Sequence, residues 1–179
     1  MEFVIRPVAA ADWPAVAAVF NQYVRGSFAA FPAEPVPEAF LRERSAQFSA
    51  YPFLVVETAG RVVGFGFLGP FHWAPTLQRS GEVTYFLDRE HTGMGIGGRL
   101  LAELLRQGEA LGVRTVLARV SSLNEGSLRF HARHGFRECG RFREVGEKEG
   151  RLFDMVWFQR ELPSPGDADG SGEPEGEDR

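Results

Sequence analysis

Apolar residues recur along this 179-residue chain with two different periods, which separate short strands from amphipathic helices. Dense β-branched and aromatic runs predict strands over residues 3–7, 53–58, 62–68, 82–87, 113–120, 136–145 and 151–160. Helical spacing predicts helices from Asp12 onward and over residues 38–49, 95–111 and 124–134, whereas the proline-rich segment 27–37 predicts a loop. This order predicts an α/β (α+β) fold with a mixed, mostly antiparallel sheet and helices on both faces.

Turn and cap residues sharpen these boundaries. Asp12 is the expected N-cap of the first helix, and glycines at 112 and 135 are expected to end the two later ones. Gly64 and Gly66 leave the third strand without side chains at two positions, which predicts that another backbone or a ligand comes close to it.

Composition and charge divide the chain into one domain, residues 1–162, and an acidic tail, residues 163–179. The tail carries six acids and one arginine among Pro, Gly and Ser, and we expect it to be disordered. The rest is close to neutral, which argues against binding to nucleic acid or to a membrane surface. A single cysteine, Cys139, excludes an intramolecular disulfide, and with no signal peptide or long apolar run it favours a cytoplasmic protein.

The most informative segment is the glycine-rich loop between the 82–87 strand and the long helix. It contains Gly93, Met94, Gly95, Ile96, Gly97 and Gly98. Glycines permit bent backbone and a close ligand, and the free N–H groups of the helix's first turn attract a phosphate or pyrophosphate. A flexible connection is less compatible with the strong helix that follows. A Rossmann fingerprint requires an acid at the end of the next strand, and this chain has none there. A nucleoside triphosphate loop ends in Gly-Lys-Ser/Thr, and this loop does not.

Read together, these features resemble the GCN5-related N-acetyltransferase (GNAT) superfamily over about residues 3 to 161. Its pyrophosphate loop has the form Gln/Arg-x-x-Gly-x-Gly/Ala, and this chain has Thr92 in the first position, with glycines at 95 and 97. Asn124 and Ser127, ahead of the FHARHGF segment at 130–136, are similar to the family's segment that meets the pantetheine.

Four stretches are more closely similar to the phosphinothricin and methionine sulfone/sulfoximine acetyltransferases: IRP at 5–7, YPFLV at 51–55, GP at 69–70, and VGEKEG at 145–150 before Asp154. The resemblance implies a GNAT acyl-CoA N-acyltransferase fold, acetyl-CoA as co-substrate, a small amino-acid-like primary amine as acceptor, and a homodimer. Those enzymes carry Glu and His where this chain has Glu82 and His131.

The reaction needs a base, because an alkyl ammonium has a pKa of about 10 and must lose a proton before the amine attacks the thioester. Glu82, beside the glycine loop, is the candidate general base, and a solvated strand-edge glutamate is the alternative. His131 lies two helical turns after Asn124; it is expected either to orient the substrate or pass a proton, or to be a satisfied histidine between helix and sheet.

Further candidates follow from the same reading. Tyr85, Phe86 and Leu87 are expected to offer backbone groups to the pantetheine and the carbonyl. Phe28, Phe31, Phe71 and Trp73 are expected to line the acceptor pocket, with core filling or a dimer contact as the alternative. Arg79 is a candidate for the substrate carboxylate, although a surface arginine is the simpler interpretation. His72 and His91 lack metal-ligand spacing, so no metal is predicted. Ser121, Ser122 and Cys139 lack a base at a recognisable spacing, which favours direct transfer.

Three other functions stay open at this point. In the first alternative, the acceptor is a protein N-terminus or a lysine, although the apolar 71–77 loop suggests a lid over a small ligand. The second is a non-catalytic acyl-CoA sensor, against which Glu82 argues. The third is a structural or partner-binding domain in which the glycine loop is a turn.

Overall fold

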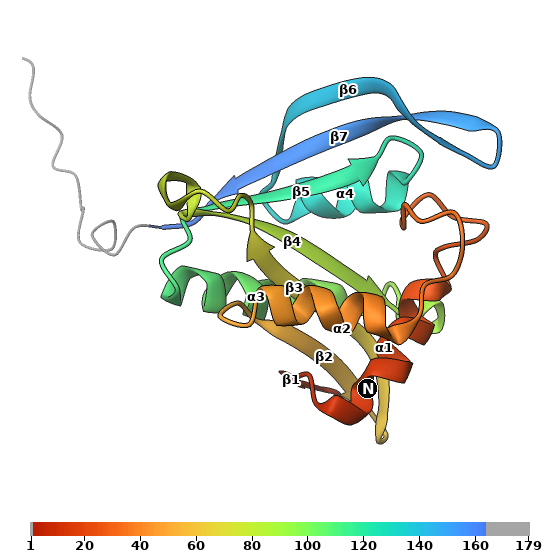
Figure 1. The fold of residues 1–179 in the computed structure, drawn as a ribbon, viewed down its shortest axis with the longest axis vertical. Coiled ribbons are helices and arrows are strands. Elements are labelled where there is room, and N and C mark those ends of the chain that lie inside the picture. Colours follow the sequence, from red (N-terminus) through yellow and green to blue (C-terminus); the bar gives the residue numbers. More distant parts are fainter. Residues whose placement is uncertain (1, 164–179) are drawn as a thin grey trace, which may run out of the picture.

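Seven strands of residues 2–163, the part of the chain that the computed structural model describes, form one sheet (Figure 1). They are β1 (Val4–Pro7), β2 (Phe53–Thr58), β3 (Arg61–Pro70), β4 (Ser80–Leu87), β5 (Thr115–Ser121), β6 (Arg137–Lys148) and β7 (Arg151–Glu161). Their spatial order is β1-β2-β3-β4-β5-β7-β6, and each neighbouring pair is antiparallel except β4 and β5, which run parallel. The predicted mixed, mostly antiparallel sheet is confirmed.

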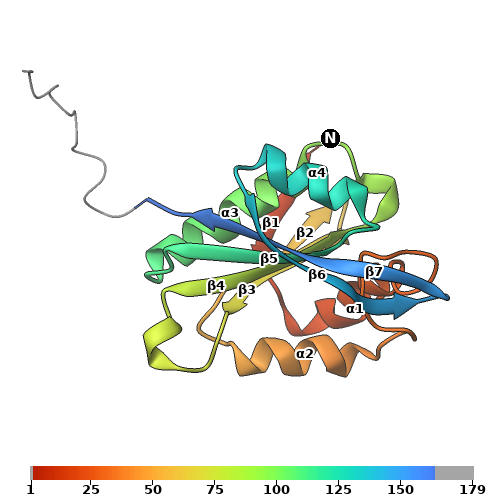
Figure 2. The ribbon, with the colours of Figure 1, turned by 90° about the horizontal axis from the view of Figure 1, so that it is seen from above.

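Helices cover both faces of the sheet, as predicted (Figure 2). The helices α1 (Trp13–Asn21) and α2 (Glu38–Gln47) lie on one face, and α3 (Ile96–Ala110) and α4 (Glu125–Arg133) lie on the other. Three short 3-10 turns, at Ala10–Asp12, Pro75–Leu77 and Arg89–His91, were not predicted. From residue 164 onward, the expected acidic tail lies outside the described residues.

Two predicted boundaries are wrong for local reasons. The Asp12 side chain does not cap α1; it accepts hydrogen bonds from the Ala9 N–H and from Arg6, and so braces the turn ahead of the helix. The fifth strand begins at residue 115 rather than 113, because the Val113 N–H donates to the Gly108 carbonyl and still belongs to the end of α3.

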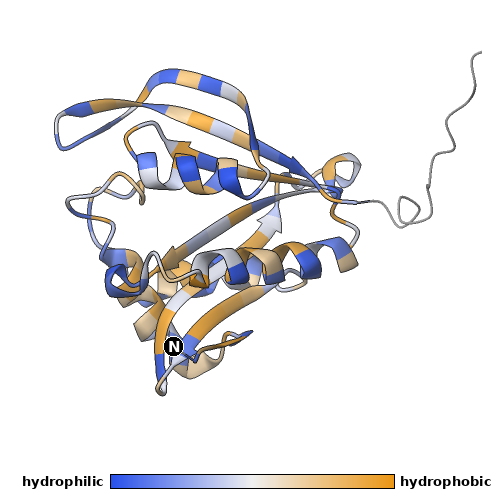
Figure 3. Ribbon diagram, turned by 180° about the vertical axis from the view of Figure 1, so that it is seen from behind, coloured by the Kyte–Doolittle hydropathy of each residue, from blue (hydrophilic) through white to orange (hydrophobic). Residues whose placement is uncertain are grey.

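The core has two parts, one on each side of the sheet. Leu100, Leu101 and Leu104 of α3 pack against one face, and the aromatic cluster around Phe20, Phe53 and Phe65 packs against the other. In Figure 3 the central strands are largely hydrophobic, whereas the β6–β7 hairpin alternates between hydrophobic and hydrophilic residues. That alternation fits an arm that reaches beyond the body of the sheet (Figure 1).

Close approach at the glycines of β3 is observed, but the nearest atoms belong to neighbouring side chains rather than to the predicted backbone or ligand. A Cβ at Gly64 would lie 2.4 Å from Leu87 Cδ2, and one at Gly66 would lie 2.9 Å from both Leu104 Cδ1 and Tyr85 Cβ. These glycines therefore let β4 and α3 sit tightly against β3.

β4 and β5 separate soon after they begin, and this separation positions the site. Their parallel pairing runs from Ser80 opposite Thr115 to Glu82 opposite Leu117. Beyond Glu82 the two strands diverge, as Figure 1 shows, while β4 stays paired with β3 as far as Leu87. The sheet thus opens between β4 and β5. Beyond Glu82, the backbone groups of β4 that face β5 have no hydrogen-bond partner on that strand.

Candidate active site

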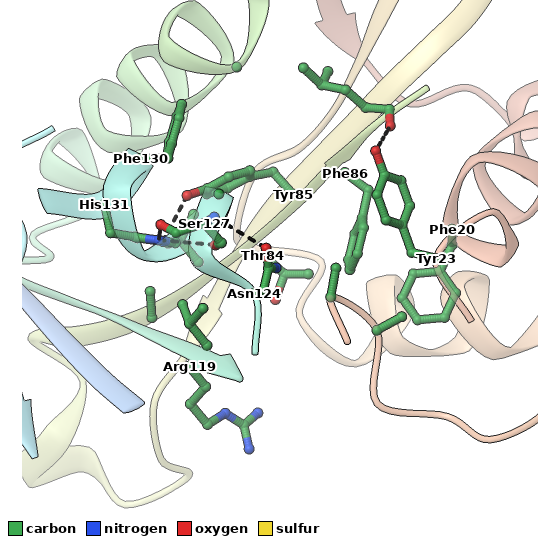
Figure 4. Close-up of a pocket in the computed structure, with 18 of the residues that line it drawn as sticks. Phe20, Tyr23, Thr84, Tyr85, Phe86, Arg119, Asn124, Ser127, Phe130 and His131 are labelled. Carbon is green, nitrogen blue, oxygen red and sulfur yellow. Dashed lines mark hydrogen bonds between the residues drawn. The ribbon is translucent and has the colours of Figure 1, made fainter. Parts of the chain in front are cut away.

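A cavity of about 1050 Å³ lies where β4 and β5 part. Its walls come from α1, α2 and the 27–32 segment on one side, and from β5, α4 and the glycine loop on the other (Figure 4). Sites for one drug-sized ligand usually have volumes of about 300–1,000 Å³, so this cavity lies at the upper end of that range and has room for two reactants at once.

The glycine loop has the geometry of a backbone anion site. Gly93 and Gly95 have φ angles of +77° and +79°, and a Cβ at either position would meet no atom within 4 Å. Gly95 is the N-cap of α3, and no side chain caps that helix. The N–H groups of its first turn therefore have no acceptor within the helix, and Gly93, Gly95, Gly97 and Gly98 all line the cavity. Met94 and Ile96 are not among the described residues that line the cavity. Met94 is half-exposed, and Ile96 is buried in the core.

Gly97 and Gly98 have a second, structural reason to lack a side chain. A Cβ at Gly97 would lie 3.3 Å from the Phe130 ring, and one at Gly98 would lie 2.8 Å from His134 Nε2. These two glycines let α4 approach the start of α3, whereas the conformations of Gly93 and Gly95 are set by the loop itself.

Glu82 lies in the cavity wall, as the third residue of β4 rather than its first. Its side chain is 16% exposed, and its Oε1 accepts from the Arg119 Nε at 2.5 Å. Arg119 is in turn held over the Trp157 ring, 5.3 Å from the centroid. This contact fixes the direction of the Glu82 carboxylate at the cavity surface.

His131 is buried in α4 and takes part in a short hydrogen-bonded chain (Figure 4). Its Nδ1–H donates to the Ser127 carbonyl at 2.8 Å, so its Nε2 is left to accept from the Tyr85 hydroxyl at 2.7 Å. Burial lowers the pKa of His131, which favours the neutral ring. Burial also raises the pKa of Tyr85, which keeps its hydroxyl protonated as the donor.

The candidate acid–base residues lie on opposite faces of the sheet. Side chains alternate along a strand, so Glu82 and Thr84 share a face with Phe86, which packs on the α1–α2 cluster. Tyr85 packs on the opposite, α3 cluster, where it meets His131. The cavity passes through the opening of the sheet, and residues from both faces line it. The sequence alone did not predict that Glu82 and His131 lie on different faces.

Asn124 and Ser127 line the cavity and also order the start of α4. Asn124 is the N-cap, and its Oδ1 accepts from the Ser127 N–H at 3.2 Å. Tyr85, Phe86 and Leu87 line the cavity as well, and the Leu87 carbonyl accepts from the Tyr23 hydroxyl at 2.7 Å.

The structure places the predicted acceptor-pocket residues unevenly. Phe31 lines the cavity, but Phe28, Phe71, Trp73 and Arg79 are not among the described residues that do so. Phe28 turns toward Phe153 and Arg151, and Phe71 packs edge-on against Trp157. The Trp73 side chain is 84% exposed, and Arg79 is exposed and supports the 114–115 backbone through its carbonyl.

Other residues take the place of these four. Phe20, Phe40, Phe67 and Arg44 line the acceptor side of the cavity together with Glu82 and Arg119. Phe20 and Phe40 lie in helices that helical spacing predicted. Nothing in that spacing distinguishes a residue buried in the core from one that borders a cavity.

Within residues 2–163, no three His, Cys, Asp or Glu side chains gather in a geometry that could hold a metal ion. No helix in the same range has the length and hydrophobicity needed to cross a bilayer.

Comparison with known proteins gives concordant results. The model of the family described as "Acetyltransferase (GNAT) domain" matches residues 14–157. Phosphinothricin N-acetyltransferase of Streptomyces viridochromogenes is 34% identical over 90% of each chain. L-methionine sulfoximine/L-methionine sulfone acetyltransferase of Pseudomonas paraeruginosa is 31% identical, covering 88% of this chain and 94% of its own.

Two solved structures are similar throughout. The first is a GNAT superfamily phosphinothricin acetyltransferase from Sinorhizobium meliloti in complex with AcCoA. It superimposes with a TM-score of 0.85 at 28% identity and covers 93% of this chain and 95% of its own. The second, a ribosomal-protein-alanine N-acetyltransferase from Brucella melitensis, has a TM-score of 0.82 at 32% identity and covers 89% of this chain and 99% of its own.

Proposed function

The chain belongs to the GNAT acetyltransferase family, and from that premise we propose that it transfers the acetyl group of acetyl-CoA to the primary amine of a small, amino-acid-like substrate. The observation that carries this proposal is the single cavity that connects the glycine loop at the start of α3 with the carboxylate of Glu82. One end offers backbone N–H groups and the other a fixed base, and the opening of the sheet lies between them.

The residues around the loop suit the diphosphate of a coenzyme A thioester. At Gly93 and Gly95 the space that a Cβ would fill is open, so a ligand can reach the backbone there. The first-turn N–H groups of Ile96, Gly97 and Gly98 would hold the diphosphate. The free edge of β4 at Tyr85, Phe86 and Leu87 would pair with the pantetheine amides and place an N–H group near the carbonyl.

Glu82 is proposed to be the general base on the acceptor side. It takes a proton from the ammonium, directly or through water, and the freed amine bonds to the thioester carbonyl carbon. The carbon–sulfur bond then breaks, the nitrogen gives up its second proton, and coenzyme A leaves as a thiolate that takes up a proton from solvent. The ion pair with Arg119 keeps the carboxylate pointing into the cavity. Direct transfer is favoured because both reactants fit into one cavity.

His131 is proposed to serve the opposite face, where the sulfur leaves. Its neutral ring accepts from the Tyr85 hydroxyl and so fixes an O–H group beside the opening of the sheet. Asn124 supports this arrangement by capping the start of α4, and Ser127 contacts the imidazole from one turn earlier in the helix.

An amine panel with acetyl-CoA and detection of the released thiol tests the proposal. The panel contains L-phosphinothricin, L-methionine sulfone, L-methionine sulfoximine and a short peptide that begins with alanine. We expect amine-dependent thiol release with the free amino acids. A chain that acetyl-CoA stabilises thermally, but that releases no thiol with any amine, would instead be an acyl-CoA sensor.

A protein N-terminus is the second candidate acceptor. The favouring observation is the similarity to the ribosomal-protein-alanine N-acetyltransferase structure, and the alanine peptide in the panel tests it. Faster turnover of the peptide than of every amino acid would favour this candidate. A homodimer and a cytoplasmic location stay predictions, and light scattering after gel filtration tests the first.

A further inference from the structure

Arg44 of α2, in the wall of the acceptor cavity, is a cation without a polar partner among the described residues. Its guanidinium lies 5.6 Å from the centroid of the Phe48 ring and 5.7 Å from that of Phe67. Within residues 2–163 it makes no ion pair or hydrogen bond, yet it lines the cavity. Stacking on two rings restricts the guanidinium while leaving its N–H groups available.

The neighbouring arginines are already engaged. Arg119 donates to Glu82, and Arg42, two residues before Arg44, pairs with Glu38 at 3.6 Å on the exposed side of the helix. Arg44 is therefore the arginine of the acceptor side whose charge is unmatched among the described residues.

Sheet register places Arg44 near the proposed base. Phe67, which lies under the guanidinium, pairs across the ladder with Thr84, two residues along β4 from Glu82 and on the same face. Two strand residues span about 7 Å. An α-amino acid carries its amine and carboxylate on one carbon, and a hydrogen bond of about 3 Å at each end covers a gap of that size.

The remaining walls on this side are mostly aromatic and aliphatic. Phe20, Phe31, Phe40 and Leu41 line the cavity, and Phe20 and Phe40 contact each other with ring centroids 6.5 Å apart. These walls can pack against the carbon chain of an amino acid whose carboxylate is held at Arg44.

We infer that Arg44 binds the α-carboxylate of the acceptor, and that the enzyme thereby selects an α-amino acid. The guanidinium grips the carboxylate through two parallel N–H donors, which sets the α-amine beside Glu82. This inference rests on the proposed acetyltransferase function and names the part of the substrate that the enzyme selects.

The test compares L-methionine sulfone with the amine that remains when its carboxyl group is removed. We expect the wild-type protein to acetylate the amino acid at least about 30-fold more efficiently, judged by kcat/KM. In Arg44→Met this preference should collapse, with the amino acid losing about 30-fold and the decarboxylated amine staying within about threefold. Arg42→Met is the matched control, because it removes the same charge from the same helix and should leave the preference unchanged.

Arg44→Lys covers the case in which Arg44→Met fails to fold. It keeps the charge and loses the planar fork, so its preference should fall between those of wild type and Met. Each variant is checked for stabilisation by acetyl-CoA, which should not change. Equal losses on both acceptors, the same collapse in Arg42→Met, or a wild type that acetylates amines without preferring the carboxylate would overturn the inference. A wild type inactive on every amine would refute the proposed function itself.

Discussion

Replacing Lys148 by Met should loosen one wall of the acceptor cavity without disturbing the coenzyme half. Lys148 ends β6, its side chain is buried, and its Nζ donates to the carbonyls of Ser27 and Ala30 at 2.8 Å each. These bonds tie the hairpin arm to the segment that contributes Ser27, Ala29, Ala30, Phe31 and Pro32 to the cavity.

The magnitude follows from the two bonds and the cost of burying the charge. A hydrogen bond to a charged group is worth about 1.5–3 kcal/mol. Desolvation lowers the pKa of Lys148, so part of that gain is offset in the folded protein. Without the ammonium, the carbonyl of Ala30 stays buried and unpaired, whereas that of the half-buried Ser27 can turn to water. We expect a net loss of about 2 kcal/mol, which lowers Tm by about 4–8 °C in a domain of this size.

The segment should stay in place but become less ordered, because other contacts hold it. Phe31 stacks on Phe153, and the Gly26 N–H donates to Glu149. The KM for the acceptor should therefore rise several-fold, while kcat changes less and the affinity for acetyl-CoA stays the same.

Differential scanning calorimetry and steady-state kinetics on both substrates measure these effects. Arg143→Met is the matched control, since it removes an exposed charge from the same strand and should change neither quantity. An unchanged Tm and acceptor KM in the Lys148 variant, or a comparable loss of acetyl-CoA affinity, would refute the reasoning.

Three further predictions concern the site itself. Glu82→Gln should lower kcat about 100-fold or more with unchanged acetyl-CoA affinity, and equal losses in both would make Glu82 structural. Gly95→Ala, at φ +79°, should cost about 1–2 kcal/mol of stability and lower the acetyl-CoA affinity at least about tenfold, as measured by calorimetric titration. The control Gly112→Ala, at φ +87°, should lose similar stability but keep normal affinity. Burial lowers the pKa of His131, so the unfolded chain binds the proton more readily and stability falls as pH drops below about 6.5, by at most about 1.4 kcal/mol per pH unit. Urea melts of His131→Asn should show a shallower pH slope, and an unchanged slope would contradict this reasoning.

Local patterns were sufficient for the architecture. Periodicity and turn residues identified the strands and helices, and the glycines ahead of α3 pointed to the loop that lines the cavity, because each of these signals is contained in consecutive residues. The same patterns missed that Val113 still closes α3, since a helix end and a strand start are both compatible with an apolar residue there.

The partners of the site residues were beyond such patterns. Arg119 reaches Glu82 from another strand, and Tyr85 reaches His131 across the opening of the sheet. Both contacts depend on how far β4 and β5 diverge, which is a property of the whole sheet. For the same reason three of the five predicted acceptor residues were placed in the 71–79 loop, whereas Arg44 on α2 lies over the face that carries Glu82.

The divergence of β4 and β5 also has a consequence for the order of events in turnover. Strand amides that lack a ladder partner exchange their hydrogens quickly with solvent, and a bound pantetheine would protect them as an added strand does. Before that, side chains link the two sides of the gap, Arg119 to Glu82 on the acceptor side and Tyr85 to His131 on the other face. The thioester should therefore bind first and rigidify the gap, so that the amine enters a chamber already formed and kinetics follow a compulsory sequence.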